Sequence, residues 1–386
     1  KLHLTSVPED GEVTITDTVS YRNLIPDVEY TLNGTLHLQS VDTDGSVKDA
    51  GAVLNGEEAV TASTTFTAEK ANGTAEVTFT FDAKGLEGKT VVAFEDLRVG
   101  DILVADHTDI ADEDQAVHFA DLATTAVASN GLSEIQVPAN GDPVTVTDTV
   151  DYMNLIPGET YTLQGTAHVR DTAEDGTITD GGALNGVNVL ASFTPVTANG
   201  STEVRFTFDA SDLAGKTVVL FETLSLGDTV ILEHADITDD AQAIHFVTMD
   251  TEALADNGTH MTQVVSGDGE TVTVTDHASY QNLIPGMTYQ FDGTLHVLTE
   301  DEEGNVTDGG VVAEAQTVFT AEEANGTAEV VFTFDASELD GQTVVAFETL
   351  SRDGQVIGNH EDLADEDQTV HFVRVRTRAL AENDEQ

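Results

Sequence analysis

Residues suited to nucleophilic and acid–base chemistry recur at matching positions in three parts of the 386-residue chain. In each part a glutamate directly follows a phenylalanine, a histidine comes 12 residues later, and a glutamine comes 8 residues after the histidine. Hydroxyl, imidazole and carboxyl groups are the usual components of covalent and general acid–base catalysis. The sets are Asp17, Glu95, His107 and Gln115; Thr124, Asp148, Glu222, His234 and Gln242; and Thr251, Asp276, Glu348, His360 and Gln368.

Each of these residues, taken singly, has an ordinary structural explanation. A glutamate on a strand usually faces solvent, a histidine in a loop such as "DHTDI" is usually a surface residue, and "DEDQ" is typical of a turn. Coincidence does not explain five residue types that keep their register from copy to copy. The pattern therefore favours a shared chemical role.

The register follows from a long internal repeat. The stretch "VVAFEDL" from Val91 returns as "VVLFETL" from Val218 and as "VVAFETL" from Val344, a period near 127 residues. This period is far above the ~20 to 50 residues of solenoid repeats, so each copy is a whole domain. We predict domain one at 1–121 with its first strand missing, domain two at 122–248, domain three at 249–373, and a segment 374–386 that is the first strand of a further repeat or a donor strand for another molecule.

The apolar pattern inside a repeat predicts strands. Val77, Phe79 and Phe81 alternate with polar residues, which is the period of a strand with one buried face. Turn signals such as "NLIPG" and "ANGT" follow at short intervals, and no long helical period is present. About seven short strands per repeat indicate an all-β chain of three Ig-like β-sandwiches.

The two ends of the chain are out of step with the repeat. Thr124 aligns with Thr251 and with Thr377, at spacings of 127 and 126 residues. The equivalent threonine of domain one would precede Lys1 by about seven residues, judged from the repeat spacing. We therefore expect domain one to lack its first strand and Thr377 to lie on a first strand without its domain.

Composition excludes several classes of function. The chain has 14 Lys+Arg against 71 Asp+Glu, and a formal charge of −57 repels nucleic acids and anionic lipids. It has no cysteine, so disulfides, thiolate metal sites and cysteine nucleophiles are excluded. We expect no membrane insertion in this segment, because no run of 18 apolar residues occurs. No EF-hand spacing is present, and we expect neither a metal nor a cofactor.

These motifs resemble the Thr-Gln ester bond domains, or VaFE repeats, of Gram-positive surface proteins. The resemblance rests on "VVAFE", on the strand and turn "DTVSYRNLIP" from Asp17, and on the fixed spacing from histidine to glutamine, and it covers essentially the whole chain. It implies Ig-like (CnaB-like) sandwiches whose first and last strands are joined by an ester that forms without an external enzyme. The chain is then not an enzyme, beyond this single reaction on itself.

The resemblance also implies a role for each residue. The threonine hydroxyl attacks the glutamine carboxamide, which nominates the pairs Thr124 with Gln242 and Thr251 with Gln368. His234 takes the hydroxyl proton and returns one to the departing ammonia. We expect Glu222 to be the carboxyl that burial keeps protonated as a donor to the oxyanion, and Asp148 to orient or polarise. Thr125, next to Thr124, remains the second choice of nucleophile, although its counterpart in domain three is a glutamate.

Domain one and the end of the chain carry incomplete sets. Gln115, with Asp17, Glu95 and His107, is an acceptor without a threonine, and Thr377 is a donor without a domain. One explanation is that the chain is a piece of a longer array. The other is that Thr377 of one molecule fills the open edge of domain one in the next and forms an ester with Gln115.

Other recurring residues are expected to be structural. His118, His245 and His371 alternate with apolar neighbours on the last strand of each repeat, and we expect them to face outward. We expect the same of His37, His168 and His296, and we expect the aspartates of the "KDAG" and "TDGG" turns to bond the backbone.

Two classes of function fit these observations. One is the shaft of an extracellular cell-surface adhesin or fimbria-like fibre, anchored to the cell wall by inference from the resemblance, whose partners are its own domains and other copies. The other is a ligand-binding module, for carbohydrate or host matrix, of a secreted or surface enzyme. The absence of tryptophan and the presence of only six tyrosines argue against sugar binding.

Overall fold

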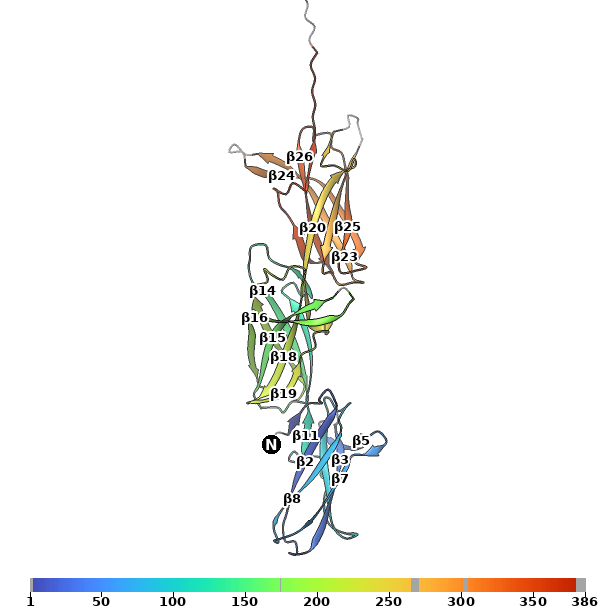
Figure 1. Cartoon of the computed structure of the whole chain (residues 1–386), viewed down its shortest axis with the longest axis vertical. Helices are drawn as coiled ribbons and strands as arrows, with labels where there is room; N and C mark the ends of the chain where they lie inside the picture. The colour runs from blue at the N-terminus through green and yellow to red at the C-terminus, as the bar shows by residue number, and fades with distance from the viewer. Residues whose placement is uncertain (1–2, 174, 265–270, 301–304, 380–386) are drawn as a thin grey trace, which may run out of the picture.

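The chain folds into three β-domains that follow one another in an elongated column (Figure 1). The computed structural model describes residues 3–173, 175–264, 271–300 and 305–379. Within these ranges one short 3-10 helix is present and every other element is a strand. The predicted all-β tandem array is therefore confirmed. None of the described residues belongs to a helix long and apolar enough to cross a membrane.

Domain one is a sandwich of a large sheet and a two-stranded sheet. The large sheet has the order β1-β11-β9-β3-β4, with β10 on β9 and β7 on β3, and it faces the pair β2-β8. A small hairpin, β5-β6, lies outside both sheets. The strands are β1 (Leu4–Thr5), β2 (Glu12–Tyr21), β3 (Glu29–Val41), β4 (Val47–Ala52), β5 (Leu54–Asn55), β6 (Glu58–Ala59), β7 (Thr61–Thr67), β8 (Gly73–Asp82), β9 (Thr90–Val99), β10 (Ile102–His107) and β11 (Ala116–Phe119).

Domain two repeats this plan with one more strand in the small sheet, whose order is β12-β14-β17. In the large sheet β16, β15, β18 and β20 are neighbours, with β13 on β20 and β19 on β18. The elements are β12 (Asp121–Ala128), β13 (Glu134–Gln136), β14 (Val144–Met153), β15 (Tyr161–Thr172), β16 (Ile178–Phe193), β17 (Gly200–Phe208), β18 (Thr217–Leu226), β19 (Thr229–His234), η1 (Asp240–Gln242) and β20 (Ala243–Ala255).

Strand β20 belongs to two domains. Its first residues pair with β18 of domain two, and Thr248 to Ala255 pair with β22 of domain three. One strand thus ends one sandwich and begins the next.

The remaining strands of domain three are β21 (Met261–Thr262), β22 (Val272–Gln281), β23 (Thr288–Glu300), β24 (Val306–Thr320), β25 (Gly326–Phe334), β26 (Thr343–Arg352), β27 (Gln355–His360) and β28 (Thr369–Phe372).

Alternating apolar residues build the core of each domain. On β8, Val77, Phe79 and Phe81 are buried while the residues between them are exposed, as the sequence pattern predicted. Burial of such side chains stabilises a domain by about 1.5 to 3 kcal/mol each relative to exposure. Each sandwich therefore has a core that forms mainly from its own repeat, with Leu4 and Leu132 added from the preceding domain.

Domain one has an open edge where domains two and three have a first strand. In domain two, β12 covers the edge of β14, with Thr124 opposite Val150. In the described part of domain one, β2 pairs with β8 alone. Val19 and Tyr21 on β2 are accordingly half-buried, whereas Val150 and Tyr152 are buried.

The predicted first strand at the other end of the chain is partly described. Val373 still donates its backbone N–H to Thr262 of β21, whereas residues 374–379 belong to no strand in the described structure, and Thr377 is exposed. The rest of that predicted segment, 380–386, lies outside the described residues.

Candidate functional site

A buried polar cluster in domain two contains four of the five predicted side chains. Thr124 lies on β12, Asp148 on β14, Glu222 on β18 and Gln242 at the end of η1. Strands β12 and β18 both pack against η1, so that the threonine and glutamine sides of the cluster meet. Sequence positions more than a hundred residues apart are brought together here because first and last strands are neighbours in the fold.

His234 lies at the edge of this cluster. It ends β19, directly opposite Glu222 on β18, and its side chain is 25% exposed. An imidazole in this place reaches the buried carboxyls on one side and solvent on the other. That position suits a group that must both take up and give away protons.

The two carboxyls share a proton. Burial and the nearby Asp148 carboxylate together raise the pKa of Glu222 to about 10. Burial raises the pKa of Asp148 as well, although the nearby Glu222 and the hydrogen bond from Gln242 partly offset this. Glu222 is therefore the protonated member at neutral pH, and its oxygens lie near Asp148 without a hydrogen-bond partner in the protein. This is the protonation state that the sequence analysis expected of Glu222.

Thr124 and Gln242 leave polar atoms unsatisfied in the cluster. The Gln242 Nε2 group donates to Asp148 Oδ1 over 3.1 Å, while Gln242 Oε1 and Thr124 Oγ1 have no hydrogen-bond partner in the protein. A buried polar atom without a partner costs about 1 to 3 kcal/mol. The Thr124 hydroxyl and the carboxamide oxygen of Gln242 are thus buried without the hydrogen bonds that would offset this cost.

An aspartate that the sequence analysis did not single out holds the histidine. His234 Nε2 is 2.8 Å from Asp239 Oδ2. The same bond joins His107 to Asp112 at 2.9 Å and His360 to Asp365 at 2.9 Å. A constant spacing of five residues from histidine to aspartate is the signal that could have revealed it. Asp148, which we expected to orient or polarise, bonds the Gln242 amide instead.

Domain three contains the same cluster. Thr251, Asp276, Glu348 and Gln368 are all buried, and His360 lies opposite Glu348 with a side chain 19% exposed. Burial and Asp276 raise the pKa of Glu348 to about 11, and the nearby Thr251 hydroxyl, which lies outside ideal hydrogen-bond geometry, lowers it in part. The Thr251 hydroxyl therefore lies beside the protonated carboxyl. The Gln368 amide approaches Asp276 but lies outside ideal hydrogen-bond geometry.

In domain one the cluster is open. Glu95 is buried, and burial with the neighbouring Asp17 raises its pKa to about 9. Asp17 and Gln115 are only half-buried, and the His107 side chain is 48% exposed. A groove beside β2 is lined in part by Glu95, His107 and Gln115. The acceptor side of the site is therefore accessible from outside.

A glycine opposite each glutamate makes room for an aromatic wall. Gly165 on β15 lies opposite Glu222, and a Cβ at Gly165 would come within 2.4 Å of Phe206 Cζ. The equivalent pairs are Gly34 with Phe79 and Gly293 with Phe332. The ring covers the strand beside the carboxyl and keeps water away from it. The recurring "GT" after the turn was the sequence signal for this glycine.

The phenylalanine before each glutamate has its own partner on the outer face. Phe221 stacks on His168 at 4.2 Å between ring centroids, and His168 Nδ1 is 3.0 Å from Asp180 Oδ2. The pairs His37 with Phe94 and His296 with Phe347 repeat this contact. These histidines are structural, as expected. They cover the phenylalanine so that its strand presents the glutamate inward.

The comparisons with known proteins agree with the repeat. The family model of the T-Q ester bond containing domain matches three consecutive segments, 4–119, 120–246 and 247–372. No curated protein sequence matches the chain.

Solved structures show only distant likeness. An adhesin from Mobiluncus mulieris, described as containing intramolecular disulfide, isopeptide and ester bond cross-links, is 19% identical with a TM-score of 0.28, over 59% of this chain and 80% of that one. The C-terminal domain of an antigen I/II-family protein of Streptococcus pyogenes is 9% identical with a TM-score of 0.27, over 65% of this chain and 98% of that one.

Because the pKa of Glu222 is raised, we expect the free energy of unfolding of domain two to fall as pH rises. The folded carboxyl keeps a proton that the unfolded one releases near 4.5, so its contribution to stability is complete below pH 4.5 and is lost as pH rises toward 10. We expect Glu222→Gln in a Thr124→Ala background to protect the β18 amides from hydrogen exchange more than Thr124→Ala alone at pH 8, and equally near pH 4. The difference at pH 8 is at most about 5 kcal/mol, since about 1.4 kcal/mol is lost for each of the roughly 3.5 pH units above 4.5. The exposed Glu203→Gln is the control. A constant difference across this range would contradict the assignment.

Proposed function

The chain belongs to the family of T-Q ester bond containing domains, and we propose that it forms the shaft of a bacterial cell-surface adhesin or fimbria-like fibre. In this proposal, esters between Thr124 and Gln242 and between Thr251 and Gln368 close domains two and three. The observation that carries it is the burial of an unbonded hydroxyl beside an unbonded carboxamide oxygen in domain two. An ester removes the unpartnered hydroxyl donor by bonding Thr124 Oγ1 to Gln242 Cδ, and the carboxamide oxygen remains as the ester carbonyl oxygen.

The reaction follows from the groups around Gln242. His234 removes the proton from Thr124 Oγ1 as that oxygen attacks Gln242 Cδ, and Asp239 holds the imidazole in place. The protonated Glu222 donates to the oxyanion that develops on Gln242 Oε1. The C–N bond then breaks, His234 returns the proton to the nitrogen, and ammonia leaves. One ester and one ammonia are formed from one alcohol and one carboxamide, so no other reactant is needed.

Asp148 has a separate part in this mechanism. Its Oδ1 accepts a hydrogen bond from Gln242 Nε2, which fixes the carboxamide in one orientation. With the nitrogen held on Asp148, the opposite oxygen is free to face a donor. Asp148 is therefore a positioning residue that decides which atom becomes the oxyanion and which leaves.

Only a short segment of chain separates the two proposed esters along the column. Gln242 precedes β20 and Thr251 lies on it, nine residues further on. Tension that enters domain two at Thr124 would pass through the ester to Gln242, along this one segment to Thr251, and through the second ester to Gln368. The remaining strands of each sandwich would carry little of it. A shaft benefits from this arrangement, whereas a ligand-binding module does not require it.

The same proposal places the chain outside the cell. Family membership and the acidic surface suit an exposed, extracellular position, and cell-wall anchoring is part of the proposal through the family alone. The chain is proposed not to be an enzyme, because each cluster reacts once and consumes its own nucleophile.

Intact mass tests the esters. We expect the folded chain to be lighter than its sequence by two molecules of ammonia, and Thr124→Ala or Glu222→Ala to restore one of them by stopping the reaction in domain two. Thr125→Ala is the matched control, because Thr125 is the neighbouring hydroxyl and should not matter. Peptide mapping that finds Gln242 and Gln368 as free carboxamides in folded protein would overturn the proposal.

The ester in domain two should also govern how that domain responds to heat and force. It closes a loop of about 118 residues, and loop entropy assigns such a link on the order of 4 to 5 kcal/mol. We expect Gln242→Ala to lower the thermal midpoint and to let domain two extend fully under tension, since force then reaches every strand. Single-molecule pulling measures the change in length. Equal lengths for wild type and variant would contradict the load path.

We propose in addition that the open edge of domain one accepts a first strand from another molecule. In residues 373–379, Val375 and Thr377 alternate with three arginines, so that one face of the strand is apolar and the other is positive. By the repeat, Thr377 would lie opposite Val19, as Thr124 lies opposite Val150. Such strand addition would bring its hydroxyl to Gln115 and join copies head to tail.

Denaturing electrophoresis tests this covalent joining. A concentrated sample of the chain should give a ladder of ester-linked multimers, and Thr377→Ala should give the monomer alone. Gln115→Ala should abolish the ladder equally, because it removes the acceptor. A single monomer band from the unaltered chain at high concentration would overturn the head-to-tail ester and leave the esters within domains untouched.

A further inference from the structure

Both joints between domains use the same three side chains. At the joint of domains one and two, Thr90 Oγ1 donates to Asn154 Oδ1 over 3.1 Å, and His118 Nδ1 is 3.0 Å from the same Thr90 oxygen. Asn154 Nδ2 donates to the carbonyl oxygen of Lys89 over 2.6 Å. Threonine and histidine come from the top of one domain and asparagine from the base of the next.

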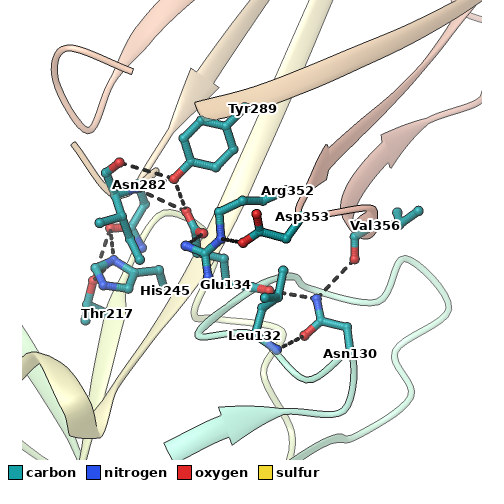
Figure 2. A network of polar contacts seen from close by, with 11 residues as sticks. Asn130, Leu132, Glu134, Thr217, His245, Asn282, Tyr289, Arg352, Asp353 and Val356 are labelled. Atoms are coloured by element: carbon teal, nitrogen blue, oxygen red, sulfur yellow. Dashed lines mark hydrogen bonds and ion pairs between the residues drawn. The ribbon is translucent and has the colours of Figure 1, made fainter. Parts of the chain in front are cut away.

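The second joint repeats the contact. Thr217 Oγ1 donates to Asn282 Oδ1 over 3.1 Å, His245 Nδ1 is 3.2 Å from Thr217 Oγ1, and Asn282 Nδ2 donates to the Lys216 carbonyl oxygen over 2.7 Å. Figure 2 shows these three side chains together at the joint. His118 and His245, which were expected to face outward, are instead half-buried parts of the joints.

The second joint also contains a buried ion pair. Glu134 of domain two is fully buried, pairs with Arg352 of domain three and accepts a hydrogen bond from the Tyr289 hydroxyl over 2.6 Å (Figure 2). The first joint has Leu4 at the place of Glu134, because these residues lie opposite His118 and His245 in register. Leu4 packs into the core of domain two. The Thr–His–Asn contact is thus the part that both joints share.

The asparagine is presented by a preformed turn. Asn154 and Asn282 have φ of 58° and 66°, a left-handed conformation that asparagine tolerates better than most residues. Their backbone N–H groups donate to the side chains of Asn199 and Asn325. The turn is therefore fixed before any neighbouring domain is present, which reduces the entropy lost on docking.

Within the described residues, each half of this contact also occurs once outside the two joints. At the top of domain three, Thr343 Oγ1 lies 2.8 Å from His371 Nδ1, and this pair is exposed. Met261 lies opposite His371, in the place of Leu4 and Glu134, and is 59% exposed. At the base of domain one, Asn23 has φ of 63° and is exposed. Its backbone N–H donates to the side-chain oxygen of Asn72 over 2.9 Å.

We propose that Thr343 and His371, with Met261 beside them, form a docking surface for the Asn23 turn of a second copy of this chain. The two joints within the chain supply the geometry, and the two free halves lie on opposite ends of one column (Figure 1). This contact deepens the head-to-tail arrangement proposed above, because a first strand donated by residues 373–379 would lead into domain one of the second copy. It is non-covalent and needs no ester.

Interdomain distances test the contact inside one chain. The chain has no cysteine, so spin labels can be placed through introduced cysteines at the exposed positions Val104 and Leu190. Asn154→Gly keeps the left-handed backbone and removes only the side chain. It should broaden the distance distribution between domains one and two, and Asn23→Gly, the same change at the unengaged turn, should not. An unchanged width in Asn154→Gly would overturn the role of the asparagine.

Sedimentation of the Thr377→Ala chain tests the docking surface, because no ester from Thr377 can then join copies. At an ionic strength that screens the charge of −57 we expect concentration-dependent association. Asn23→Gly and Thr343→Val should each weaken it by about fivefold, as one lost hydrogen bond predicts. Thr217→Val, at an internal joint, should leave it unchanged. A monomer at all concentrations, or association constants that these two variants do not alter, would overturn the docking surface, whatever the fate of the ester.

Discussion

A carboxyl pair buried in the core of domains two and three is the constraint around which the rest of the structure is arranged. Asp148 and Glu222 are at most 1% exposed, and such a pair is tolerated only if one member stays protonated. Protonation makes Glu222 a potential donor, and the neighbouring Asp148 holds the carboxamide of Gln242. The glycine and phenylalanine beside them, Gly165 and Phe206, keep the site dry. The free-energy cost of burying polar groups thus falls on the residues that are proposed to react.

The shared strand β20 links this chemistry to the architecture of the column. Because the last strand of domain two continues as the first strand of domain three, the acceptor of one cluster and the nucleophile of the next lie on one uninterrupted segment. A helix or a flexible linker at this point would separate the two clusters mechanically. The junction between two domains is therefore as much a recurring part of the array as the domains themselves.

The joints show how a column of such domains can be stiff without a large interface. A single asparagine on a fixed turn satisfies a threonine, a histidine and a backbone carbonyl of the preceding domain. Each of these bonds is modest alone, but all are made by groups already held in place, so little entropy is lost. The neighbouring position varies from Leu4 to Glu134, which lets individual joints differ in strength while the shared contact sets their geometry.

The sequence by itself determined the repeat, the all-β class and the residue types of the site, because alternation and register are local or periodic properties. It also nominated Glu222 as the protonated carboxyl, through the resemblance to ester bond domains and the place of this glutamate after Phe221 in an apolar strand. Three features were decided only by the tertiary structure. Asp239, five residues after His234, became its partner through a turn that periodicity does not describe. His118 and His245 became joint residues because another domain packs on them. The open edge of domain one was expected from the repeat, but the groove lined by Glu95, His107 and Gln115 beside β2 was decided by the fold, because it joins residues from distant strands.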